Sequence, residues 1–225
     1  MNRTIIYLLL LVTSATAVIT TGCREDGPDS VEATLYDIVC LSEVSKQCTR
    51  FTLTKPGNDD VITYSVNGAL DTTHVKVGER LLLAYRTNKQ APYTSGFITP
   101  IGYSLITNDT LTAGYISNVT DWNRDPVYLT SVWMSQHYLN IRARLPYDSQ
   151  PRLLTVMVDS LTIANDYPDC YLIHRLEEPI NTFDRSYYMS FDVKALLDRP
   201  SCRGFNLILN NSNLPHDEYR FNISK

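Results

Sequence analysis

The feature that most constrains this chain is an alternation of apolar and polar residues with a period of two, which begins near Ser30. Turn-forming residues interrupt it about every 8 to 14 residues. Successive side chains of a strand point to opposite faces of a sheet, whereas apolar positions on a helix recur every three to four residues. The sequence therefore predicts an all-β protein.

The first half of the chain contains six candidate strands, separated by turn signals such as Asn67-Gly68 and Asn108-Asp109. No interval between them has room for more than a short helix. A series of short strands with this spacing is typical of a small barrel, which we predict for residues 31–120. The candidate strands are Val31–Leu41, Gln47–Thr54, Val61–Val66, Arg80–Thr87, Phe97–Thr107 and Leu111–Ser117.

A polar segment with a proline, Thr120–Pro126, separates this region from a second one at residues 125–225. Here Leu139 and Ile141 alternate with Arg142, as in a sheet with one buried and one solvated face. Seven candidate strands predict a β-sandwich. Their approximate ranges are 127–134, 138–145, 152–163, 170–176, 187–193, 204–210 and 218–223. Val193–Asp198 is expected to form one helical turn before Pro200.

The first 22 residues form a removable leader that ends directly before Cys23. One basic residue, Arg3, precedes an apolar core of about 14 residues, fewer than the roughly 20 that span a bilayer as a helix. A cysteine after Gly22 at the end of such a leader predicts a lipid on Cys23, followed by a polar tether over residues 23–30. The alternative is an ordinary secretory leader that is cleaved near Ala17.

Arg24, Glu25 and Asp26 follow the predicted lipidation site. This order of one basic and two acidic residues is similar to the surface-export signals of Bacteroidetes lipoproteins. We therefore expect the protein to be anchored by its lipid in the outer membrane and exposed at the cell surface. The alternatives are that the acidic residues only keep the tether solvated, and that the protein faces the periplasm.

The net charge of the chain bears on whether it binds nucleic acid. Without the leader the chain has 19 basic and 24 acidic residues, a net charge of 19 − 24 = −5. It lacks the basic clusters of nucleic-acid-binding proteins, so we expect no nucleic-acid partner.

An even number of remaining cysteines in an exported chain suggests disulfides, with three possible connectivities. Their spacing favours one bridge in each half: Cys40–Cys48 and Cys170–Cys202. It does not match a zinc site, and we expect no metal and no cofactor.

Five segments carry a family resemblance: Ala33–Val39, Arg80–Arg86, Val132–Ile141, Leu172–Arg175 and Tyr188–Val193. Together they extend over nearly the whole chain after the leader, and they resemble the NigD-like lipoproteins of Bacteroidetes. The resemblance implies an OB-like N-terminal barrel followed by a C-terminal β-sandwich, in agreement with the strand count. It implies no reaction.

Five residues are candidate ligand contacts. His174 lies in the middle of a predicted strand, and Glu177-Glu178 follow it, where a carboxylate could orient the imidazole. The alternative is a buried structural histidine. Exposed aromatic residues of β-domains often stack on sugars or lie in protein interfaces, although tyrosine is also common on half-buried strands. The aromatic candidates are Tyr93, Trp122, Tyr147 and Tyr167.

The sequence contains no recognisable catalytic motif. The adjacent acidic pair Asp59-Asp60 would point to opposite faces of a strand, and neither a Gly-x-Ser-x-Gly elbow nor a phosphate-binding loop occurs. We therefore predict a non-enzymatic lipoprotein of the cell envelope that binds an unknown protein or glycan ligand or acts as a structural partner. The alternatives are a glycan-binding accessory protein at the cell surface and a hydrolase with an unrecognised site.

Overall fold

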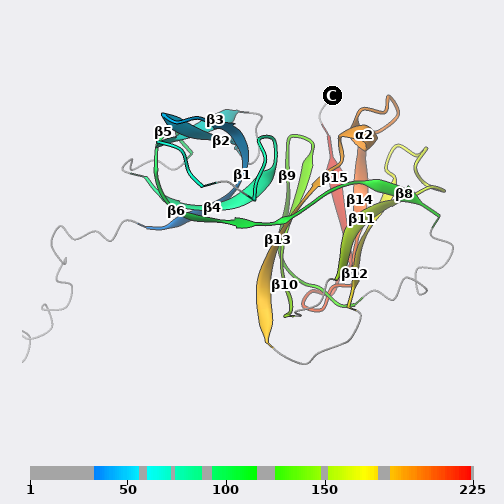
Figure 1. The fold of residues 1–225 in the computed structure, drawn as a ribbon. Helices are drawn as coiled ribbons and strands as arrows, with labels where there is room; N and C mark the ends of the chain where they lie inside the picture. The colour runs from blue at the N-terminus through cyan, green and yellow to red at the C-terminus, as the bar shows by residue number, and fades with distance from the viewer. Residues whose placement is uncertain are drawn as a thin grey trace, which may run out of the picture. The chain divides into compact units, whose positions relative to one another are not determined.

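The computed structural model describes residues 33–55, 60–71, 74–87, 93–115, 125–147, 152–176 and 183–223. Its regular structure is almost entirely strand, in three sheets (Figure 1), so the prediction of an all-β protein is confirmed. A short helix, α2 (Lys194–Leu197), ends one residue before Arg199-Pro200, as predicted. The leader, Cys23, the Arg24–Asp26 signal and Trp122 lie outside the described residues. Within the described ranges, no helix has the length and apolar character needed to cross a membrane.

The first sheet has six strands in the order β5-β3-β2-β1-β4-β6. Apolar residues on its inner face form one core, which includes Leu41, Phe51, Leu83 and Tyr85. They alternate with more exposed positions because of the strand period, so most predicted ranges of this region are confirmed as strands. The strands are β1 (Leu35–Val44), β2 (Cys48–Thr54), β3 (Val61–Asn67), β4 (Arg80–Arg86), β5 (Gly96–Phe97) and β6 (Thr99–Leu105).

Both edges of this sheet are formed by one stretch of chain. β5 pairs with β3 and β6 pairs with β4, and only Ile98 separates β5 from β6. Ile98 is buried, and its backbone N–H donates to the carbonyl of Ser65 at 3.0 Å. The sheet therefore curves strongly (Figure 1), but no ladder joins β5 to β6 among the described residues, and it is not a closed barrel.

The other two sheets share a single apolar core. β10 presents Leu139, Ile141, Ala143 and Leu145 to it, and all four are fully buried, whereas Arg142 is exposed, as the alternation predicts. The four-stranded sheet has the order β7-β13-β10-β9, and the five-stranded sheet has the order β15-β14-β12-β11-β8. The strands are β7 (Thr107–Thr110), β8 (Thr112–Gly114), β9 (Tyr128–Ser135), β10 (Tyr138–Pro146), β11 (Leu153–Asp159), β12 (Asp169–Arg175), β13 (Asp184–Asp192), β14 (Gly204–Ile208) and β15 (Glu218–Asn222).

The segment Thr99–Gly114 contributes a strand to each sheet. β6 belongs to the first sheet, β7 pairs in parallel with β13, and β8 pairs in parallel with β11. The sequence placed Leu111–Ser117 in the same barrel as the preceding strands, but β8 belongs to the five-stranded sheet. Alternation identifies a strand and its two faces, and it contains no information on which strand will be the neighbour. The predicted division into separate domains at residues 31–120 and 125–225 stays a prediction.

Neither predicted disulfide is formed, since the four described cysteines are free thiols. Cys40 lies opposite Thr52 and Cys48 lies opposite Asn67. Cys48 is four residues from Thr52 along β2 (52 − 48 = 4), so at about 3.3 Å per residue it lies roughly 13 Å along the ladder from Cys40, far beyond the reach of a bridge.

Cys170 and Cys202 are both fully buried in the shared core. The Cys202 thiol donates to the carbonyl of Gly204 at 3.3 Å, and burial raises the pKa of the Cys170 thiol well above its usual value. Both residues therefore act as small core residues with weakly acidic thiols, a role that chain spacing alone does not distinguish from a bridge.

Candidate functional site: a pocket with a buried arginine

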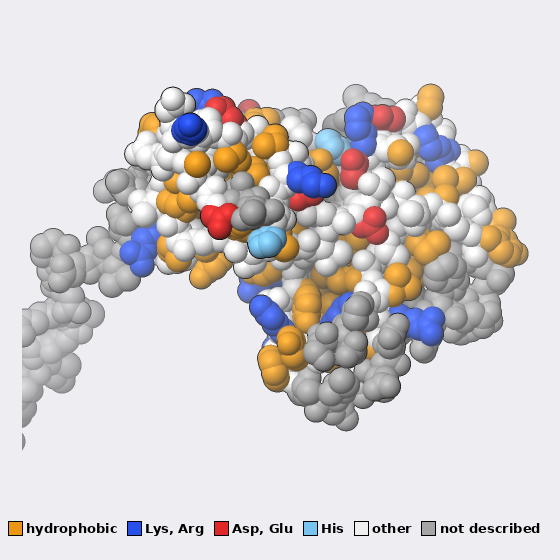
Figure 2. Space-filling model, in the orientation of Figure 1, with side chains coloured by type: hydrophobic (Ala, Val, Ile, Leu, Met, Phe, Trp, Pro, Cys, Tyr) orange, Lys and Arg blue, Asp and Glu red, His pale blue; other side chains and the backbone are white. Residues whose placement is uncertain are grey.

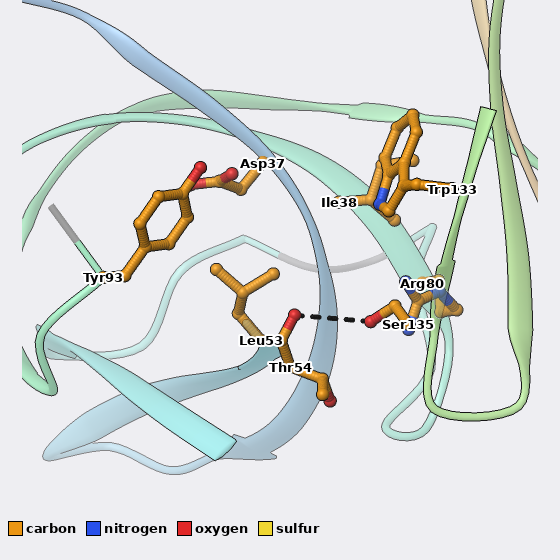
Figure 3. A pocket seen from close by; sticks show the side chains of 8 residues that line it. All are labelled: Asp37, Ile38, Leu53, Thr54, Arg80, Tyr93, Trp133 and Ser135. Carbon is orange, nitrogen blue, oxygen red and sulfur yellow. Dashed lines mark hydrogen bonds between the residues drawn. The ribbon is translucent and has the colours of Figure 1, made fainter. Parts of the chain in front are cut away.

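A pocket of about 160 Å³ lies between the first sheet and β9 (Figure 3). Its described wall comes from three strands of that sheet, from the start of the segment that leads into β5, and from β9. Ser135 of β9 donates a hydrogen bond to the carbonyl of Thr54 in β2 at 3.4 Å, which links the two sides of the wall. The lining residues are Asp37, Ile38, Leu53, Thr54, Arg80, Tyr93, Trp133 and Ser135.

Arg80 is buried although it lies on the outer face of the first sheet. It begins β4 directly opposite Cys40, whereas the neighbouring Leu81 belongs to the inner core. Tyr138 and Asn140 of β10 cover it, and only 9% of its surface is exposed. The guanidinium carbon lies 4.1 Å from the centroid of the Tyr138 ring, and Nη2 donates to Asn140 Oδ1 at 3.1 Å.

The charge of Arg80 is not compensated by an acidic residue of the described part of the chain. Among the described residues no carboxylate forms a salt bridge with it, and its buried Nε has no hydrogen-bond partner. Burial lowers the pKa of Arg80, while nearby Tyr138 and Cys40 raise it. A buried cation is costly unless it is paired and fully hydrogen-bonded. The pocket therefore contains a buried cation that would be stabilised if an anion bound beside it.

Asp37 belongs to a chain of buried hydroxyl groups. Its Oδ2 accepts a hydrogen bond from the Tyr85 hydroxyl at 2.6 Å, and the Tyr64 hydroxyl lies 2.9 Å from that of Tyr85. Because Tyr85 has one hydroxyl proton, Tyr64 acts as the donor in the second bond. Burial raises the pKa of Asp37, and the hydrogen bond from Tyr85 opposes this shift only in part. Asp37 is therefore more easily protonated than an exposed aspartate.

Aromatic rings complete the wall. Tyr93 is 39% exposed, and in Figure 3 its hydroxyl points toward the Asp37 carboxyl. The negative charge of Asp37 is the main cause of a raised Tyr93 pKa. The indole of Trp133 lies beside Ile38 in the same view. The pocket thus combines a cation, a carboxyl with a raised pKa and apolar surface, which suits a small ligand with one polar end.

Among the residues proposed from sequence, Tyr93 lies in the pocket. Tyr147 stacks on Phe183 instead, with ring centroids 5.1 Å apart, and the Tyr167 ring lies 4.7 Å from the guanidinium carbon of Arg220. Neither lines the pocket. The structure does not bring these aromatic residues together into one site, and whether each contacts a ligand stays a prediction.

His174 is fully buried in β12, away from the pocket lining. Its Nε2 lies 3.3 Å from Nη1 of Arg152, which also donates through Nη2 to the Pro146 carbonyl at 2.7 Å. Burial is the largest cause of its lowered pKa, and Arg152 adds to the shift. Complete burial beside an arginine, with a lowered pKa, favours the structural alternative for His174. In the described part of the chain, no cluster of His, Cys, Asp and Glu has the makeup of a metal site.

Sequence reasoning did not identify Arg80, Asp37, Trp133 or Ser135 as site residues. The signal for Arg80 is a charged residue at the head of an apolar run, Arg80–Tyr85, on a face that alternation assigns to solvent. Its burial depends on β10, a strand that begins 58 residues after Arg80 in the chain (138 − 80 = 58). Nothing in the local pattern of β4 indicates that cover.

The fold and the pocket define an all-β protein of three sheets with a small polar site. The sequence matches no protein-family model and no curated protein. Among solved structures the fold is similar to a protein of unknown function of the DUF1344 type from Bacteroides vulgatus, with a TM-score of 0.66 and 16% identity over 86% of this chain and 92% of that one.

It is also similar to a NigD-like immunity protein from Bacteroides caccae, with a TM-score of 0.56 and 15% identity over 84% of this chain and 93% of that one. A candidate lipoprotein from Bacteroides fragilis shares the fold with a TM-score of 0.59 and 8% identity, over 86% and 99% of the two chains. The resemblance to NigD-like proteins that the sequence suggested is thus confirmed at the level of fold.

Proposed function

We propose that this protein is a lipid-anchored protein of the cell envelope that acts by binding, and that the Arg80 pocket is its binding site. The observation that carries the proposal is the buried guanidinium in the pocket wall, which has no acidic partner among the described residues. Stability alone does not account for a cation in this position, because an apolar residue there would avoid the cost of burying a charge. The leader before Cys23 and the lipoprotein and immunity-protein descriptions of the structural neighbours support the location.

We also propose that the fold consists of an OB-like barrel followed by a β-sandwich. The first sheet corresponds to an OB-like barrel, because the segment Gly96–Leu105 passes from one of its edges to the other. The remaining two sheets correspond to a β-sandwich, because they share one core. On the face drawn in Figure 2, acidic and basic side chains of the described residues are interspersed, which fits a ligand other than nucleic acid.

The binding function is tested with a screen of small fragments that are neutral, cationic or anionic, with ligand-observed NMR on the full chain. We expect fragments that bind the wild type and lose affinity in Trp133→Ala, but not in Phe183→Ala. Phe183 is a matched control because it is an exposed aromatic residue outside the pocket lining. If no fragment of any charge depends on Trp133, the pocket is not the binding site.

The location is tested by fractionation and by adding protease to intact cells. Cys23→Ser should release the protein from membranes. If Glu25 and Asp26 act in surface export, the wild type should be digested on intact cells, and changing both to Ala should protect it while leaving the lipid in place. Protection of the wild type until the outer membrane is permeabilised would instead show that it faces the periplasm.

A glycan-binding role is the second candidate, and one observation favours it. Tyr147 and Phe183 form a nearly parallel stack with an interplanar angle of 7°, and Phe183 is 63% exposed. An exposed aromatic face of this kind can stack on a sugar ring. A glycan array should then show binding that is lost in Phe183→Ala and kept in Trp133→Ala, the reverse of the pattern expected for the Arg80 pocket.

A further inference from the structure

We propose that the ligand of the Arg80 pocket is a small carboxylate, with its anionic group at Arg80 and its apolar part against Trp133 and Ile38. This inference rests on the proposed function, because it assigns a chemical class to the ligand of that site. It concerns the described lining of the pocket only.

The first argument is that the guanidinium of Arg80 has no anionic partner among the described residues. Asn140 is a neutral acceptor, and its Oδ1 is shared with the Ser190 hydroxyl, which donates to it at 3.0 Å. The Tyr138 ring offers the cation a face but no formal charge. A carboxylate would supply the missing charge, and hydrogen bonds between ionised groups are about twice as strong as those between neutral groups. The guanidinium is also held in place by its contacts, so little of its side-chain entropy remains to be lost on binding.

The second argument is the charge of the rest of the wall. Asp37 is the acidic residue of the described lining, and its charge would repel an anion placed beside it. Burial raises its pKa, and the Tyr85 hydroxyl donates a hydrogen bond to its Oδ2. Asp37 and Arg80 also lie at separate points along the ladder, since Asp37 pairs with Leu83 and Cys40 pairs with Arg80. The anion is therefore favoured at Arg80 and is not excluded by Asp37.

The third argument is the size and lining of the pocket. Its volume of about 160 Å³ is below the range of about 300 to 1,000 Å³ that is typical of drug-sized ligands. Ile38, Leu53 and the indole of Trp133 provide apolar surface for a compact ligand body (Figure 3). The ligand class is thus a small molecule with a carboxylate at one end and an apolar or aromatic portion at the other.

Benzoate, benzamide and benzylamine test this inference because they have the same ring with an anionic, a neutral and a cationic group. Their affinities for the full chain are measured by calorimetric titration. We expect benzoate to bind about tenfold or more tightly than benzamide, the difference expected of a hydrogen bond to a charged group. Benzylamine should be the weakest ligand. Arg80→Gln should remove the preference for benzoate, whereas Arg86→Gln, at the exposed end of the same strand, should keep it.

Equal or tighter binding of benzamide overturns the inference, as does a preference for benzoate that persists in Arg80→Gln, or no measurable binding of benzoate. If Arg80→Gln does not fold, Arg80→Lys retains the charge and should retain the preference, and the comparison of benzoate with benzamide on the wild type still decides the ligand class. Neutral fragments that bind in a Trp133-dependent way without any preference for benzoate would leave the binding function standing and refute only the carboxylate.

Discussion

Neighbouring residues of β10 lie in opposite environments, which three substitutions would reveal. Leu139 and Ile141 are fully buried in the shared core, and Arg142, directly after Ile141 on the strand, is exposed. We expect Leu139→Asp or Ile141→Asp to lower the free energy of unfolding by about 3 kcal/mol or more, because each places an unpaired charge in an apolar core. Arg142→Asp should cost about 0.5 kcal/mol or little more, since it changes a surface side chain. Urea denaturation measures all three, and the reverse ranking would contradict the assignment of faces.

His174 should make stability depend on pH between neutral and mildly acidic conditions. Burial and Arg152 lower its folded pKa below the ordinary value of 6.5. Below that pH the unfolded chain binds a proton that the folded chain does not, so acidification favours unfolding. The contribution of His174 is therefore complete above pH 6.5 and is progressively lost as the pH falls toward its folded pKa. The difference in unfolding free energy between the wild type and His174→Gln should shrink from pH 7 to pH 5. Parallel losses of stability in both proteins would show that His174 titrates alike in the folded and unfolded chains.

At the scale of elements, the pairing of β14 with β15 depends on a glycine. A Cβ on Gly204 would lie 1.9 Å from the backbone oxygen of Phe221 and 2.9 Å from the Tyr167 ring. The backbone cannot give way without separating the two strands. We expect Gly204→Ala to lower the unfolding free energy by about 2 kcal/mol or more. Gly102 in β6 has no atom within 4 Å of an added Cβ, so Gly102→Ala is the matched control and should have little effect. Thermal denaturation compares them, and similar melting temperatures for the two variants would show that β15 can move away at little cost.

At the scale of the molecule, the described sheets are linked by chain and by side chains. Thr99–Gly114 supplies one strand to each sheet, and the buried pair Arg80 and Asn140 connects β4 to β10. The region Thr34–Lys225 also forms one compact unit. We expect urea unfolding to follow a single transition, with tryptophan fluorescence and far-ultraviolet circular dichroism giving the same midpoint. Two separated midpoints would instead support the independent domains that the sequence analysis predicted.

The sequence by itself determined the fold class, the position of most strands and the face on which each side chain lies. Leu139, Ile141 and the turn at Lys194–Leu197 could be predicted because alternation, and the restriction that a proline places on the preceding residue, are properties of the local backbone. No contact with a distant part of the chain is needed for either.

The tertiary structure decided which strands are neighbours, which thiols can meet and where the pocket lies. β8 could be recognised as a strand, but only its hydrogen bonds to β11 assign it to a sheet. The separation of Cys40 from Cys48 follows from the β1–β2 register, and the burial of Arg80 follows from the cover provided by Tyr138 and Asn140. Pairing and burial are set by contacts between residues far apart in the chain, and a period-two pattern is the same whichever partner covers it.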